Sequence, residues 1–364
     1  MTNGSNCSFT EVNELMMSLQ LVIYIPIFVF GLILNSLALV VLCVYLKKWM
    51  ESTIYMTNLA LMDMLLLFPM PFKMHATKHQ WNADKRVLCS FLESLYFISV
   101  YGSIYTIMCI AVDRYIAIKH PFRAKQLRSP RAAMATCALI WAVVVGATAP
   151  VYRFHDDDKG PFRCFHGFSD AGWNPALIVC LELLGFLGPT LVLVACSVQI
   201  VRALRSSQQN SAKQQACIRI IYSNLVIFLV PFTPCHLGIF LQFLVRCGII
   251  TDCDAKTRIS LFVQVAMSLS NITCCLDAFC YYFTTREIRA SGGQIRQSFS
   301  QRRTNSTSEP PPVASAKEAA ACRMVKFTGD SVFLPEAKCD SQPVYALPFA
   351  LPALQKNNSA EVYQ

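Results

Sequence analysis

A charged tripeptide, Asp113-Arg114-Tyr115, stands at the end of the third of seven long apolar stretches in this chain. Charges at that depth are expensive when they face lipid, so they normally face protein or water. An aspartate beside an arginine can hold the arginine in a local ion pair. Release of the pair would free the arginine for a partner, so we predict a switch that acts at this end of the molecule.

Two further charges lie deeper in the second stretch. Asp63 is near its middle, where a carboxylate must be protonated, paired or hydrated. Lys73 follows Pro69-Met70-Pro71-Phe72, where an unpaired ammonium is costly. We expect Glu93, in the third stretch, to be its partner. Lys73 would then either contact a ligand or form a purely structural ion pair.

The elements that must position these residues are long apolar segments. The chain is 54% hydrophobic and 15% charged, and a helix needs about 20 apolar residues to span a bilayer. Strand-like alternation is missing from the stretches, which argues against a closed barrel. A soluble core would hardly bury so many of them. We predict an all-α membrane protein, a bundle of seven transmembrane helices near residues 20–46, 54–76, 89–118, 133–152, 175–204, 217–245 and 259–283.

Charge at the ends of the first stretch predicts the orientation. Lys47 and Lys48 follow it directly, while Glu11 and Glu14 precede it, and basic loops stay in the cytoplasm. We therefore expect a multi-pass plasma-membrane protein with an extracellular N-terminus. The formal charge of +10 is spread over loops and tail, so we predict no nucleic-acid partner.

The remaining segments divide by composition. Residues 1–19 are expected to form an extracellular segment with glycosylation sequons at Asn3 and Asn6. The seven-helix domain covers 20–283, and 284–296 is predicted to be a short amphipathic eighth helix on the inner leaflet. Residues 297–364, rich in Ser, Thr, Pro and Ala, are predicted to be a disordered cytoplasmic tail.

Four cysteines fall on the predicted outer face, where disulfides can form: Cys7, Cys89, Cys164 and Cys253. Four cysteines allow three pairings, and their positions alone leave the choice open.

Together these marks resemble the rhodopsin-like G-protein-coupled receptors over roughly residues 15–297. Beyond the tripeptide, the matching helix markers are Asn35, Asp63, Trp141, Pro189 and Pro234. The resemblance implies a Cys89–Cys164 disulfide, because Cys89 precedes Arg114 by the family's 25 residues. We then expect Cys7 to pair with Cys253.

The resemblance also assigns inner residues. It implies a polar pocket of Asn35, Asp63 and Asp277 that could bind sodium, although a protonated Asp63 is the alternative; no other cofactor is expected. The implied switch and G-protein-coupling residues are Asp113, Arg114, Tyr115, Phe228, Phe232, Pro234, Asp277 and Tyr281. Two positions depart from the family, since Asp277-Ala278 replaces an Asn-Pro pair and Phe232 replaces a tryptophan.

The outer ends indicate the ligand class. Tyr96 occupies the position where amine receptors of the family carry a carboxylate, so a monoamine is not expected. The outer ends carry many basic residues, which favour an anionic ligand. The candidate ligand-binding residues are Lys73, Glu93, Tyr96, Tyr101, His236, Phe240, Phe243, Arg246 and Met267.

Several segments, among them 12–16, 236–246 and 274–282, resemble receptors of the family for lysophosphatidylinositol, an anionic lysophospholipid. This implies signalling through heterotrimeric G proteins to RhoA and calcium, with arrestin binding after tail phosphorylation. Other segments, such as 54–60, are equally similar to receptors for small aromatic acids of the kynurenate type. The basic residues Arg123, Lys125, Arg128 and Arg131 of the second inner loop are expected to face the G protein or anionic lipid. A transporter would be expected to show an inverted repeat, and no nucleophile–base set or metal-ligand cluster predicts an enzyme.

Overall fold

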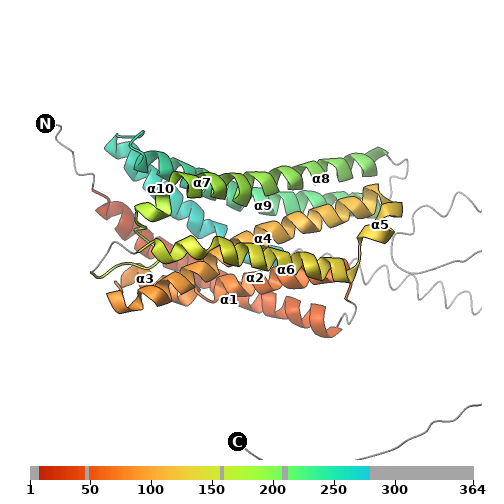
Figure 1. Cartoon of the computed structure of the whole chain (residues 1–364), viewed down its shortest axis with the longest axis horizontal. Coiled ribbons are helices and arrows are strands. Elements are labelled where there is room, and N and C mark those ends of the chain that lie inside the picture. The colour runs from red at the N-terminus through yellow and green to blue at the C-terminus, as the bar shows by residue number, and fades with distance from the viewer. Residues whose placement is uncertain (1–7, 46–48, 156–159, 207–211, 279–364) are drawn as a thin grey trace, which may run out of the picture. The chain divides into compact units, whose positions relative to one another are not determined.

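The computed structural model describes residues 8–45, 49–155, 160–206 and 212–278. Within them seven helical segments are long and apolar enough to cross a membrane. Their bounds are Thr10–Val44, Glu51–Lys78, Ala83–Lys119, Pro130–Arg153, Pro175–Ser206, Gln214–Arg246 and Cys253–Ala278. The predicted bundle of seven spans is confirmed (Figure 1).

The spans are built from helices interrupted at a few places. The first combines α1 (Thr10–Val40) with a π-helical turn, η1 (Val41–Tyr45). The second combines α2 (Glu51–Leu67) with α3 (Met70–Lys78). Pro69 lies between α2 and α3, because its ring cannot donate the backbone hydrogen bond that would continue the helix. The third is η2 (Ala83–Lys85) followed by α4 (Arg86–Lys119), and α5 (Pro121–Leu127) is the loop helix after it.

The later spans follow the same rules. The fourth is α6 (Pro130–Ala147) with η3 (Ala149–Arg153), and η4 (Asp170–Trp173) lies in the next loop. The fifth contains α7 (Pro175–Glu182), a π-helical turn η5 (Leu183–Leu187) and α8 (Gly188–Ser206). The sixth lies in α9 (Ala212–Arg246), which is continuous through two prolines. The seventh begins with α10 (Cys253–Ser270).

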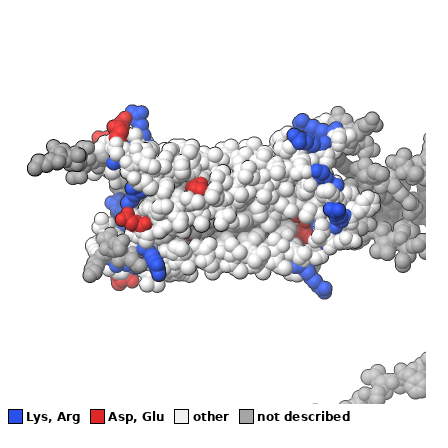
Figure 2. All heavy atoms as spheres, turned by 45° about the horizontal axis from the view of Figure 1, so that its top comes forward, with Lys and Arg blue, Asp and Glu red and all other residues white. Residues whose placement is uncertain are grey.

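Helix α4 is the central element of the bundle, since it packs against α2, α6 and α8. Basic side chains gather at the two ends of the molecule, and the band between them shows only isolated acidic atoms (Figure 2), as suits a bilayer.

Several helices are longer than the apolar stretches predicted. Helix α1 starts at Thr10 rather than at residue 20, because Val12 and Met16 are buried against the bundle. Apolar composition marks the part in hydrocarbon, whereas polar turns extend the helices beyond it. The predictions for Asn3, Asn6, Cys7, Tyr281, the eighth helix and the tail lie outside the described residues.

Candidate functional site

A cavity of about 590 Å³ opens among the outer halves of the spans. Its walls come from α4, α6, α7, η5, α9 and α10, together with the loop that precedes α7. Most of its lining is aliphatic or aromatic, including Phe97, Tyr101, Tyr105, Val144, Leu184, Ile239 and Met267. Cavities of this size and character hold small molecules or lipid chains.

Cationic groups lie at the loop end of this cavity. Arg163 and His166 come from the loop, and Arg246 from the end of α9. The guanidinium of Arg246 stands 5.6 Å from the centre of the Trp173 ring, an arrangement that fixes the arginine in place. Burial, helped by the charges of Lys73 and Arg163, lowers the pKa of His166. The cavity therefore combines an apolar body with two permanent cations.

The cavity contains three of the predicted ligand residues, Tyr101, Arg246 and Met267. Lys73, Glu93, Tyr96, His236, Phe240 and Phe243 do not line it. Phe240 is 46% exposed on the outer surface of the bundle, so its predicted place in the cavity is wrong.

Lys73 is buried in an aromatic box. Its Nζ lies 4.2 Å from the centre of the Tyr96 ring, 5.2 Å from that of Tyr24 and 5.5 Å from that of Phe165. Such cation–π contacts stabilise a desolvated ammonium. The predicted ion pair with Glu93 is wrong. The break at Pro69 changes the direction of the helix, so spacing along the chain did not fix which way Lys73 points.

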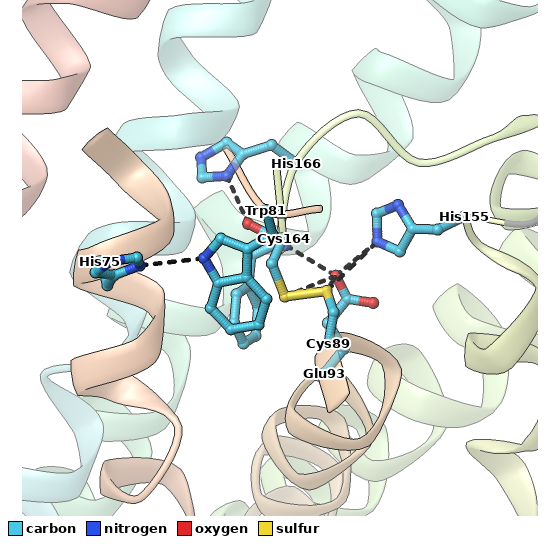
Figure 3. The surroundings of a disulfide bond; sticks show 8 residues. His75, Trp81, Cys89, Glu93, His155, Cys164 and His166 are labelled. Carbon is cyan, nitrogen blue, oxygen red and sulfur yellow. Dashed lines mark hydrogen bonds and ion pairs between the residues drawn. A yellow bond between two sulfur atoms is a disulfide. The ribbon is translucent and has the colours of Figure 1, made fainter. Parts of the chain in front are cut away.

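Glu93 instead binds the loop behind a disulfide. Cys89 and Cys164 are bonded, which confirms that pairing. The Oε1 of Glu93 accepts the backbone N–H of Phe165 at 2.8 Å and pairs with Nε2 of His155 at 2.9 Å (Figure 3). Glu93 is fully buried, so it orders the loop rather than meeting a ligand. Cys253 is also disulfide-bonded, but its pairing with Cys7 remains a prediction.

The inner switch differs from the prediction in its ion pair. Asp113 binds Arg128 through both carboxylate oxygens, at 2.7 and 2.9 Å, rather than its neighbour Arg114. Successive side chains on a helix point in different directions, so the loop arginine is better placed. Arg128 thus binds the bundle here, and its contact with the G protein or lipid stays a prediction. The Arg114 Nε is buried and has no hydrogen-bond partner in the described part of the chain.

The other predicted switch residues lie in the core or near it. Phe228 and Phe232 are buried, with ring centres 5.2 Å apart. The Tyr115 hydroxyl donates to Gln199 at 3.3 Å. Pro234 lies within α9.

The predicted sodium pocket is polar and buried. The Asn35 amide donates to the carbonyls of Gly31 and Cys274 at 3.0 and 2.9 Å, and Asp63 is 2% exposed. The Asn35 Oδ1 and the Asp277 Oδ2 are buried without a hydrogen-bond partner in the described segments. Unsatisfied oxygens of this kind suit a cation. However, Asp277 lines a small inner cavity of about 50 Å³ together with Arg114, not one with Asp63 or Asn35.

Sequence reasoning missed the loop contribution to the large cavity. His166 and Trp173 carry no periodic signal, and only their proximity to Cys164 could have indicated that they fold over the bundle. Two polar pairs were missed for the same reason. Glu182 pairs with His236, and His155 pairs with Glu93, and in each pair the two residues come from separate elements.

Comparisons with known proteins agree with this architecture. Residues 34–281 match the family model described as 7 transmembrane receptor (rhodopsin family). The chain is 43% identical over 295 residues to human G-protein coupled receptor 55, covering 79% of this chain and 91% of that protein. It is 36% identical over 269 residues to human G-protein coupled receptor 35, covering 72% and 82%. It is 31% identical over 277 residues to human lysophosphatidic acid receptor 4, covering 74% and 75%.

Proposed function

Because the chain belongs to the rhodopsin family of seven-transmembrane receptors, we propose that its agonist is an anionic lysophospholipid, lysophosphatidylinositol. The observation that carries the proposal is the apolar cavity with Arg163 and Arg246 at its loop end. Arginine matches the geometry of phosphate oxygens, and the aliphatic walls match an acyl chain. The similarity to a receptor named for lysophosphatidic acid points to the same ligand class.

The acyl chain has a route from the bilayer. Val143 on α6 and Leu184 in η5 line the cavity and are also exposed on the lipid-facing surface. A lysolipid can therefore enter between the fourth and fifth spans without first leaving the membrane. Its phosphoinositol head then remains at the loop end, beside the two arginines.

Signal transfer follows from a shift between two conformations that bind the ligand unequally. The inner half of span six moves outward, and the groove so formed accepts the C-terminal helix of a G-protein α subunit. Opening releases Asp113 from Arg128 and leaves Arg114 available to the partner. The proposal also includes signalling to RhoA and calcium, arrestin binding to the phosphorylated tail and an extracellular N-terminus. It further includes a bound sodium ion near Asp63 and the absence of enzymatic activity.

The test measures calcium and RhoA activation in cells expressing the chain at matched surface levels. Lysophosphatidylinositol and kynurenate are compared on the wild type, Arg246→Ala and Arg258→Ala. Arg258 is the matched control, because its side chain is 79% exposed and it lies outside the cavity. We expect a response to the lysolipid that Arg246→Ala weakens about tenfold or more, as loss of a charge-assisted contact implies, and that Arg258→Ala preserves.

A response to kynurenate with silence to the lysolipid would refute the proposal. The small box around Lys73 would then be the better candidate site for an aromatic acid. A Lys73→Ala variant, assayed in parallel, distinguishes the two sites, since Lys73 does not line the large cavity.

A further inference from the structure

A buried histidine and a half-buried glutamate join spans five and six beside the large cavity. His236 of α9 is 2% exposed, and its Nδ1 donates to Oε2 of Glu182 at 3.2 Å. Glu182 is the last residue of α7, immediately before the π-helical turn η5. Its Oε1 is buried and has no hydrogen-bond partner among the residues described. This carboxylate therefore depends heavily on its histidine partner, because a buried charge without compensation is costly.

The His236 ring also begins a series of aromatic contacts that joins the two spans. It stacks on Phe186 of η5 with centres 4.3 Å apart and planes within 7°. Phe186 stacks on Phe228 of α9 at 6.3 Å, and Phe228 contacts Phe232 at 5.2 Å. Any change in the Glu182–His236 contact is thus passed by direct packing to the buried phenylalanines at the centre of the bundle.

The cavity touches this pair through one tyrosine. Tyr101 lines the cavity, and its ring meets His236 edge-on at 6.1 Å. The same ring packs so closely on Gly185 that a Cβ there would lie 2.8 Å from it. A molecule that moves Tyr101 must therefore disturb either His236 or η5.

We propose that Glu182 and His236 form a latch, which holds the outer parts of spans five and six together in the resting receptor. The hydrogen bond from His236 to the carboxylate is charge-assisted, which makes it stronger than a contact between neutral groups. The other titratable groups facing the pair are Tyr101 on α4 and Cys235 on α9, with Lys73 of α3 beyond Cys235. The inference rests on the outward movement of span six proposed above.

The latch couples the cavity to the spacing of spans five and six. A ligand that displaces Tyr101 weakens the Glu182–His236 contact, because the tyrosine ring packs on both His236 and Gly185. Loss of the contact should therefore raise basal activity.

The experiment follows span six directly in the purified full chain, reconstituted in lipid nanodiscs without ligand. Spin labels attached through unnatural amino acids at the inner ends of α4 and α9 report the distance between them. The variants are Glu182→Gln, which keeps the side-chain shape, His236→Phe, which keeps a ring for the stack on Phe186, and the double variant. Asp254→Asn is the control, because it removes an exposed ion pair with Arg258.

We expect the wild type and Asp254→Asn to have the same small open population. Both single variants should raise it severalfold, and the double variant should add nothing further. Single variants that keep the wild-type population, or a double variant whose effect is the sum of the two, would overturn the latch. A wild-type distance that stays fixed even with a G protein bound would overturn the movement of span six itself, and the latch with it.

Discussion

Removal of the Arg128 side chain should raise the ligand-independent activity of this receptor. Arg128 reaches from the second inner loop to both carboxylate oxygens of Asp113 and lies 3.7 Å from Glu51. It thereby ties the loop to α4 and α2. Burial opposes the charge on Arg128, but the hydrogen bond and charge of Asp113 outweigh that effect and raise the pKa of the guanidinium. Arg128 therefore keeps its charge at any physiological pH.

The size of the effect follows from the geometry of the pair. Hydrogen bonds to charged groups contribute about 1.5–3 kcal/mol, and exposed pairs contribute less than about 1 kcal/mol. The Arg128 side chain is 27% exposed and that of Asp113 9%, so an intermediate value of about 1.4 kcal/mol is appropriate. If this free energy stabilises only the resting state, its loss multiplies the ratio of open to resting receptor by about ten.

The assay is G-protein dissociation in cells without added ligand, at equal surface expression. Arg128→Ala and Asp113→Asn should each raise the basal signal, and the double variant should match the single ones because both changes remove one interaction. Arg258→Ala is the control, since it removes an exposed ion pair with Asp254 in α10, away from this loop. An unchanged basal signal in Arg128→Ala, with normal expression, would refute the idea that this pair stabilises the resting state.

Three further outcomes test the outer half. Loss of the Cys89–Cys164 disulfide, which closes a loop of 75 residues, should lower the free energy of unfolding by about 4 kcal/mol. Surface expression and thermal stability should fall with it. Cys247→Ser, which removes an exposed free thiol, should change neither. Gly185→Ala places a Cβ 2.8 Å from the Tyr101 ring and should lower lysolipid potency severalfold in concentration–response curves. Gly146→Ala, where the space is open, should leave that potency unchanged. Burial lowers the pKa of His166, so this side chain is neutral at pH 7. The folded state favours the neutral form, and it therefore loses stability as the pH falls through the pKa of His166. An anionic ligand favours the protonated form, so affinity in a radioligand assay should rise as the pH falls from about 7 to about 5, and His166→Asn should abolish the rise.

The sequence predicted the seven spans because the length of an apolar stretch is dictated by the thickness of the bilayer. It did not predict where the spans end. Val12 and Met16 extend α1 by packing against other helices, and such contacts between distant segments have no local signal.

Side-chain partners were harder to predict than helices. Lys73 and Glu93 were expected to pair because both are charged residues in apolar helices, yet they have separate partners. Lys73 contacts aromatic rings. Glu93 binds His155 and the backbone of Phe165, and both come from the loop that the disulfide fixes. The fold of that loop depends on tertiary contacts, so its residues in the cavity could not be assigned from spacing.

Phe165 connects the two outer sites that the prediction had merged into one. Its ring lines the large cavity and also lies 5.5 Å from the Lys73 ammonium. Its backbone has a φ of 67°, an uncommon conformation for a side chain of this size, and Glu93 accepts its N–H. A headgroup that binds Arg163 and Arg246 can therefore reach Lys73 only if the Phe165 ring moves aside. Glu93 thus acts as a positioning residue, because it holds in place the ring that separates the arginines from the lysine.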